Sequence, residues 1–245
     1  MNTFVDSADT AIQLITSMNP GLWAIAARSL GVSATACVLG CLLGITWGAY
    51  LGVARFNFKP LVLTILNTLL ALPSVVVGLV IYLLLSRTGP LGSLGWLFSF
   101  KAMVIAQLVL VFPVAAALSR QVVEDAESAH GEQWRSLGAD KMMRCLLLAW
   151  NERFALLTVV VACFGRAISE VGAVMIVGGN IDGFTRVMTT AIALETSKGD
   201  LPLALAMGIV LLAIVGFLNL LLTLLRHWQD RYQQSLPSSL RGWVA

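Results

Sequence analysis

Charged side chains are scarce in this sequence of 245 residues. Asp, Glu, Lys and Arg make up 12% of it, whereas a soluble globular protein carries roughly 25%. Hydrophobic residues make up 58%, and they gather in long uncharged runs instead of following the spacing of amphipathic elements. The composition excludes an ordinary water-soluble enzyme and indicates an integral membrane protein.

Other absences exclude further classes. The 16 Lys and Arg residues form no dense basic stripe of the kind that nucleic-acid phosphates require, so we expect no nucleic-acid partner. The four cysteines form no CxxC pair, and we interpret them as small packing residues. We expect the chain to have no metal site and no catalytic residues. A GxxxxGK[ST] phosphate loop is also missing, so we expect no cofactor on this chain and ATP on another polypeptide.

Uncharged runs predict the membrane-spanning helices, each of which needs about 20 apolar residues. Arg166 and Glu170 interrupt one of the runs, and another is shorter than the rest. The predicted fold is an all-α integral membrane protein with five transmembrane helices and a cytoplasmic loop. The predicted spans are 29–54, 60–86, 102–119, 154–181 and 201–225, and the loop is 120–153.

The orientation follows from the basic residues, because cytoplasmic loops carry an excess of Lys and Arg. Ten of them fall on the side of the predicted loop and five on the other side. This predicts an outer N-terminus, an inner C-terminus and a multi-pass protein of the cell (plasma or inner) membrane. Residues 1–22 are then an outer-surface segment with a short helix, and 23–245 the transmembrane domain.

Small residues and prolines mark helix contacts and breaks. A glycine stripe with four-residue spacing lets another helix backbone approach closely, either in this chain or in a second copy. Pro73 and Pro113 each remove a backbone hydrogen bond within a predicted span, so we expect a kink or hinge at both, as occurs in rigid bundles and at gates alike. The stripe consists of Gly40, Gly44, Gly48 and Gly52.

The predicted loop holds twelve ionisable residues and still reads as helical. Gly138 interrupts it, and Asp140 is placed to cap a second helix at 141–150. We therefore predict a helix, a glycine turn and a second helix.

Residues 132–139, Glu-Gln-Trp-Arg-Ser-Leu-Gly-Ala, resemble the cytoplasmic EAA loop of ABC importer permeases. Glu132 and Gly138 match the spacing of that motif, Glu-Ala-Ala, three residues, then Gly. Gln133 and Trp134 replace the two alanines, and Trp150 and Asn151 stand where the family has Leu-Pro.

Residues 165–173, Gly-Arg-Ala-Ile-Ser-Glu-Val-Gly-Ala, resemble the membrane signature of molybdate, tungstate and sulfate permeases. The stretches 178–181 and 185–200 look most like the tungstate branch.

The resemblance implies a type I ABC importer permease that moves an oxyanion by alternating access. The implied partners are a second copy of the chain, two ABC ATPase subunits holding ATP and Mg, and a periplasmic or surface-anchored oxyanion-binding protein. The glutamate of the loop would sit in a cleft of the ATPase. The implied coupling residues are Glu132, Trp134, Arg135, Leu137, Gly138 and Ala139.

Alternatives stay open at two points. Arg166 and Glu170 either form a buried ion pair that fixes helix packing, or Arg166 helps a divalent oxyanion past the low-dielectric centre. The substrate is tungstate by resemblance, with molybdate or sulfate as the alternatives. A secondary anion carrier is the other class of function, although the chain shows no internal repeat of the type that such carriers have.

Overall fold

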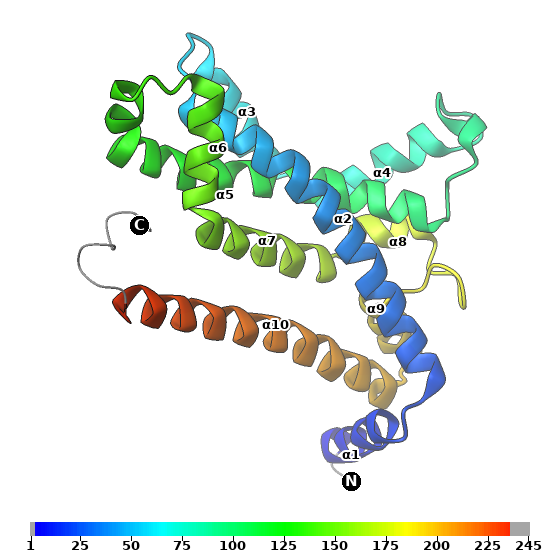
Figure 1. Cartoon of the computed structure of the whole chain (residues 1–245). Helices are drawn as coiled ribbons and strands as arrows, with labels where there is room; N and C mark the ends of the chain where they lie inside the picture. The colour runs from blue at the N-terminus through cyan, green and yellow to red at the C-terminus, as the bar shows by residue number, and fades with distance from the viewer. Residues whose placement is uncertain (1–2, 236–245) are drawn as a thin grey trace. The chain divides into compact units, whose positions relative to one another are not determined.

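The structure, a computed structural model, describes residues 3–235 (Figure 1). All regular secondary structure in that range is helical, which confirms the predicted all-α class. The helices are α1 (Thr3–Thr16), α2 (Pro20–Val53), α3 (Lys59–Leu70), α4 (Ser74–Leu85), the 3-10 helix η1 (Gly92–Leu94), α5 (Phe100–Ser136), α6 (Lys141–Asn151), α7 (Arg153–Ile168), α8 (Gly172–Gly178), α9 (Met188–Lys198) and α10 (Leu201–Ser235).

The chain divides into two compact units, each assembled from three separate stretches. Four helices, α2, α5, α7 and α10, contribute one part to each unit. Within 3–235, the first unit contains 3–39, 72–110 and 164–215, and the second contains 40–71, 111–163 and 216–235.

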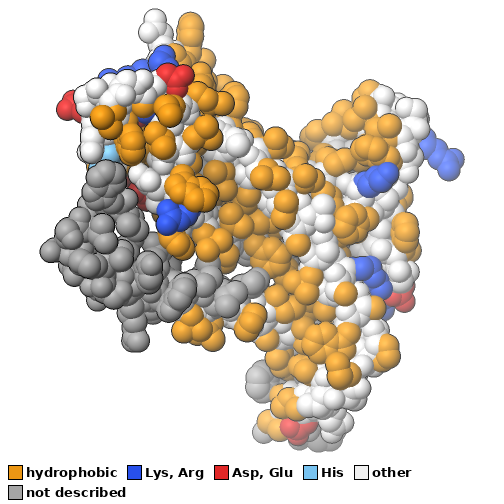
Figure 2. Space-filling model, in the orientation of Figure 1, with side chains coloured by type: hydrophobic (Ala, Val, Ile, Leu, Met, Phe, Trp, Pro, Cys, Tyr) orange, Lys and Arg blue, Asp and Glu red, His pale blue; other side chains and the backbone are white. Residues whose placement is uncertain are grey.

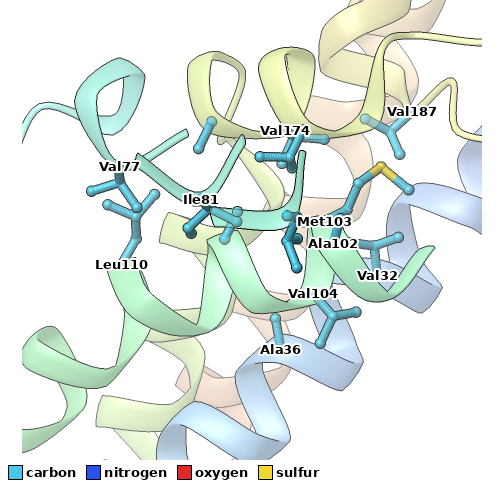
Figure 3. Packing of buried hydrophobic residues seen from close by; sticks show 14 residues of the cluster. Val32, Ala36, Val77, Ile81, Ala102, Met103, Val104, Leu110, Val174 and Val187 are labelled. Carbon is cyan, nitrogen blue, oxygen red and sulfur yellow. The ribbon is translucent and has the colours of Figure 1, made fainter. Parts of the chain in front are cut away.

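The first unit has an apolar core in which α4, α5 and α8 meet (Figure 3). In Figure 3, Val77 of α4 lies beside Leu110 of α5, and Met103 of α5 lies beside Val187, while Ile81 of α4 and Val174 of α8 belong to the same buried cluster. Gly78 makes the α4–α8 approach possible, because a Cβ atom there would stand 2.8 Å from the Ala173 Cα atom. A second cluster joins α2, α9 and α10 and includes Leu22, Ala26, Met188, Ala191, Ala206, Met207 and Val210.

In the second unit, the glycine stripe of α2 packs against α5 of the same chain. A Cβ atom at Gly44 would lie 2.5 Å from the Ala115 Cβ atom, and one at Gly40 would lie 2.8 Å from a Val111 methyl group. Gly48 and Gly52 meet α5 in the same way, on the Ala116 carbonyl oxygen and on Val123. The two backbones are therefore closer than side chains would permit.

The predicted span 60–86 is not one helix. It divides into α3 and α4, whose axes differ by 95°. Pro73 stands at the break because it has no N–H to continue the helix, and its carbonyl oxygen instead accepts hydrogen bonds from Val76 and Val77 at 3.0 and 3.2 Å. Each 12-residue helix is about 18 Å long, less than the roughly 30 Å of the hydrocarbon core.

Pro113 has a different outcome from Pro73. It lies inside α5, a 37-residue helix that continues without a break from the predicted span 102–119 into the predicted loop. The structure therefore shows a helix break at Pro73 and an uninterrupted helix at Pro113.

The continuous helix expected over 154–181 is also divided. The α7 helix ends at Ile168, and α8 begins at Gly172. At its other end α7 is bent by 76° from α6, with Glu152 between the two helices. Glu170 therefore lies beyond the helix that carries Arg166 and not one turn further along it.

Length and apolar composition identify two described helices, α2 and α5, as long enough to cross a membrane, and up to four spans if each bent pair counts as one. Leu201–Phe217 is a shorter apolar helix by the same criteria. Apolar side chains cover much of the face seen in Figure 2. The exposed ones include Leu42 and Leu43 of α2 and Leu79 and Leu83 of α4.

Candidate functional sites

The predicted loop forms a helix, a tight turn and a second helix. The N–H of Gly138 donates to the Arg135 carbonyl at 3.0 Å, and the N–H of Ala139 donates to the Trp134 carbonyl at 3.0 Å. This is a Schellman motif, which requires the left-handed conformation seen at Gly138, where φ is +81°. Asp140 then caps α6 by accepting the Met143 N–H at 2.7 Å. The predicted turn and cap are both confirmed.

A buried ion cluster joins the end of α5 to α6. Glu127 Oε1 accepts Arg135 Nη2 at 2.7 Å, and it also accepts Arg144 Nη1. The side chains of Glu127 and Arg144 are each 8% exposed, whereas Arg135 is 40% exposed. One carboxylate therefore faces two guanidinium groups, of which one is shielded from water.

Apolar contacts surround this cluster. Ala49 and Val53 of α2, Val123 and Ala126 of α5, and Cys145 and Leu148 of α6 form one buried group, against which Trp134 packs. Burial raises the pKa of the Cys145 thiol. The thiol lies 3.6 Å from the Ala49 carbonyl oxygen and serves as a packing group. Together, the ion cluster and the apolar group fix the shape of the turn.

The predicted coupling residues divide into two sets. Glu132, Leu137 and Gly138 are exposed, and Leu137 is 71% exposed. Arg135 is exposed too, but it pairs with Glu127, and the half-buried Trp134 packs against the apolar group. Ala139 is half-buried in the turn. Glu132 and Leu137 are therefore exposed on a loop whose shape is held by the ion cluster and the buried apolar group.

Sequence reasoning missed Glu127 and Arg144. Two signals were available in the chain. Arg144 stands beside Cys145 on the face of α6 that also carries Leu148, where an apolar residue is expected. Gly131 follows Glu127 by one turn, and a Cβ atom there would stand 2.6 Å from the Glu127 carboxyl carbon.

A second, more exposed ion cluster ties α3 to α5. Lys59 Nζ lies 3.0 Å from Glu124 Oε1, and Arg120 pairs with Glu124 Oε2. Glu124 is 40% exposed, so water screens these pairs.

The Arg166–Glu170 pair lies in the first unit. Arg166 Nη1 and Glu170 Oε2 are 2.6 Å apart, which confirms that the two side chains pair. Glu170 Oε1 also accepts the Ala173 N–H at 3.1 Å at the start of α8, and the Ser74 hydroxyl of α4 bonds to the same carboxylate. The Glu170 side chain is 4% exposed and the Arg166 side chain 39% exposed. Glu170 is thus a buried anchor, while Arg166 keeps an accessible face.

Gln107 holds the end of α7 from the side of α5. Its Nε2 atom donates to the Ala167 carbonyl at 2.9 Å and lies 3.4 Å from the Ser33 hydroxyl of α2. The Thr189 hydroxyl donates to the Glu170 backbone carbonyl at 2.8 Å. Together with the Ser74 contact described above, polar contacts from α4, α5 and α9 therefore support the break between α7 and α8.

Within residues 3–235, no three His, Cys, Asp or Glu side chains lie close enough together to hold a metal ion.

Residues 44–233 match the family described as "Binding-protein-dependent transport system inner membrane component". The chain belongs to this family. It is 41% identical over 219 residues to the tungstate uptake system permease protein TupB of Peptoclostridium acidaminophilum, covering 89% of the chain and 96% of that relative. It is 40% identical over 165 residues to the protein of the same name from Campylobacter jejuni, covering 67% and 69%. It is 33% identical over 195 residues to the sulfate transport system permease protein CysW of Escherichia coli K12, covering 74% and 65%.

These relatives are named as transport permease proteins and not as enzymes. The resemblance to ABC importer permeases, drawn from 132–139 and 165–173, is confirmed at the level of the family. The EAA-type loop and the Arg166–Glu170 pair both lie inside the matched residues.

Proposed function

We propose that this chain is the membrane-spanning permease subunit of an ATP-driven importer that carries tungstate into the cell. The observation that carries the proposal is the 41% identity, over 96% of the relative's length, to a protein named for tungstate uptake. Identity to the sulfate permease is lower, at 33%. Molybdate and sulfate are the alternative substrates, because they are tetrahedral dianions too.

The proposed topology has five spans, an outer N-terminus and an inner C-terminus in the cell membrane. The surplus of basic residues on the side of the 120–153 loop supports this orientation. The long apolar helices α2 and α5 support a multi-pass protein. The bent pair α3 and α4 would then supply a broken span, which other helices must cover so that the free backbone groups at Pro73 avoid lipid.

The proposed assembly contains a second copy of this chain, two ABC ATPase subunits and an external oxyanion-binding protein. The sequence contains no phosphate-binding loop, which supports placing ATP and Mg on the ATPase subunits. Tight substrate recognition is assigned to the binding protein, because a path that held the anion tightly would slow its release.

The coupling role is assigned to the loop that ends α5. Glu132 lies on the same unbroken helix as Ser119, about 20 Å further along at 1.5 Å per residue. We assign the ATPase contact to Glu132 and Leu137, which are exposed, and the shape of the loop to Trp134, Arg135 and Gly138. Movement of the ATPase would then reach the membrane through α5.

Arg166 is assigned to the anion path, with Glu170 as its anchor. The exposed guanidinium offers a positive charge at a depth where an unaccompanied dianion would lose its hydration. The other contacts of Glu170 hold α8 and α4, so its loss would disturb packing as well as charge.

Transport in proteoliposomes tests the proposed function. The permease is purified with its ATPase and binding protein, reconstituted, and supplied with ATP and Mg on the ATPase side. We expect tungstate uptake that requires ATP and exceeds the uptake of equimolar molybdate or sulfate. Uptake that follows an ion gradient without ATP would identify a secondary carrier, and preference for another oxyanion would change the substrate.

Glu132→Ala tests the coupling role within the same system. We expect the complex to assemble and hydrolyse ATP while uptake falls at least tenfold. Asp125→Ala is the matched control, because it removes another exposed carboxylate from α5 without touching the turn. Wild-type uptake by an assembled Glu132→Ala complex would overturn the assignment.

Replacing the pair tests the role of Arg166. The double variant Arg166→Gln, Glu170→Gln removes both charges and places a neutral amide at each position; the amide at 170 has nearly the shape of the carboxylate, whereas the one at 166 is shorter than the arginine. If Arg166 assists the anion, uptake falls while assembly and ATP hydrolysis remain. Normal uptake by this variant would show that the pair serves packing alone.

A further inference from the structure

The α6 helix carries a stripe of exposed apolar side chains. Met142, Leu146 and Trp150 follow one another at four-residue steps and therefore lie on one face. Their exposed fractions are 65%, 66% and 70%. The opposite face carries Arg144, Cys145 and Leu148, which are buried against α2 and α5 or paired with Glu127. The stripe is therefore the outer side of an amphipathic helix.

A sharp bend separates α6 from the predicted span that follows it. The α7 helix follows after Glu152, and the two helix axes differ by 76°. If α7 crosses the bilayer, a helix at this angle runs nearly parallel to the membrane plane at the point where the chain enters it. Leu157 of α7, beyond the bend, is an exposed apolar side chain as well.

The residues around the stripe have the chemistry of an interfacial helix. Residues 141–151 contain Lys and Arg but no Asp or Glu. Lys141 is exposed at one end, and Arg153 lies just past the other, with its guanidinium carbon 5.5 Å from the centre of the Trp150 ring and 4.7 Å from that of Phe154. A tryptophan beside a cation at the edge of an apolar face is typical of the boundary between acyl chains and anionic headgroups.

This surface differs from the one assigned to the ATPase. The residues assigned to the ATPase contact, Glu132 and Leu137, precede the turn at Gly138, and Glu132 contributes a carboxylate to that surface. The stripe follows the turn, contains apolar side chains alone, and lies on the helix that directly precedes α7. Continuity with a predicted membrane span favours lipid as its occupant.

We propose that the Met142–Leu146–Trp150 stripe lies in the inner leaflet of the membrane, with Lys141 and Arg153 at anionic phospholipid headgroups. The α6 helix would then anchor the coupling loop to the bilayer surface. The proposal rests on the proposed orientation of the permease, but it requires neither tungstate nor transport.

Spin labelling in nanodiscs tests it. Leu146→Cys is labelled with a nitroxide in nanodiscs of phosphatidylethanolamine and phosphatidylglycerol, and collisions with oxygen and with a water-soluble nickel chelate are measured. Leu137→Cys, at an exposed position on the other side of the turn, is the matched control. The four native cysteines are buried, and the unsubstituted chain gives the background labelling.

We expect the label at 146 to collide several-fold more often with oxygen than with the nickel chelate, and the label at 137 to show the reverse. Adding the ATPase subunits should leave both collision rates of the label at 146 unchanged. A label at 146 that is reached by the chelate, and is shielded only after the ATPase is added, would make the stripe a protein contact. A label at 146 that is reached by the chelate in both states would also overturn the proposal.

Lipid charge supplies a second measurement. In nanodiscs of phosphatidylcholine alone, the label at 146 should become more accessible to the chelate, and Lys141→Gln with Arg153→Gln should remove this dependence on lipid charge. An equal response to both lipids in the unsubstituted background would refute the headgroup contact. Lipid-like values at 146 combined with absent tungstate uptake would overturn the proposed function and leave this inference standing.

Discussion

Glu127→Gln is the substitution that should most disturb the loop without touching its exposed face. The change keeps the shape of the side chain and removes its charge. Arg144, 8% exposed, then has no counter-charge in the cluster, whereas Arg135, 40% exposed, can turn toward water. The cost therefore falls mainly on the buried guanidinium.

The magnitude follows from this difference in exposure. Removing one partner of a buried ion pair costs about 3–5 kcal/mol, and removing a partner of an exposed pair costs about 0–1 kcal/mol. We expect Glu127→Gln to fall in the first range. Glu124→Gln should cost less, because its carboxylate is 40% exposed and its two cations, Lys59 at 17% and Arg120 at 23%, are less buried than Arg144.

Thermal unfolding in detergent, followed by far-ultraviolet circular dichroism, measures both variants under one condition. The double variant Glu127→Met, Arg144→Met completes the comparison, because replacing a whole buried pair by apolar groups is often nearly neutral. It should recover most of the stability that Glu127→Gln loses. The reasoning is refuted if Glu127→Gln and Glu124→Gln have equal midpoints, or if the double variant is as unstable as the single one.

Three further outcomes follow from local geometry. Gly138 has a φ of +81°, which is unfavourable for a residue with a Cβ atom even though no atom beyond its chain neighbours would lie within 4 Å of that Cβ. Gly138→Ala should therefore lower the unfolding midpoint by the equivalent of about 1–2 kcal/mol. A midpoint equal to that of the unsubstituted chain would contradict this. Gly48→Ala should cost about 1–3 kcal/mol, since its Cβ would press on the Ala116 carbonyl of α5, whereas Gly216→Ala, with no atom within 4 Å, should be neutral or stabilising. Burial raises the pKa of the Cys145 thiol, so at pH 9 iodoacetamide should modify Cys145 many times more slowly than a cysteine introduced at the exposed position 137. Mass spectrometry measures both rates, and equal rates would contradict the buried placement of Cys145.

Local signals in the sequence predicted the loop well. Gly138 and Asp140 act through contacts with their own neighbours, and the turn and the cap formed where these residues stand. The pairing of Arg166 with Glu170 was also predicted from their four-residue spacing. Glycine spacing predicted a close helix contact, but the choice between this chain and a second copy needed the structure, which places α5 against the stripe.

Long-range contacts could not be predicted from a single sequence. Glu127 and Arg144 are 17 residues apart on different helices, and they meet only because the turn folds α6 back toward α5. The helix break after Ile168 was also missed, because apolar composition does not distinguish one long helix from two short ones. Gln107, Ser74 and Thr189 support that break from distant parts of the chain.

The glycine stripe limits where a substrate can travel. Along 40–52 the backbones of α2 and α5 are so close that at Gly40, Gly44 and Gly48 an added methyl group would have to displace an atom of α5. A seam that has no room for a methyl group has none for an oxyanion, which is larger and carries water with it. The conducting surface must therefore be sought on other faces of these two helices, and mutations that widen this seam should damage stability before they affect selectivity.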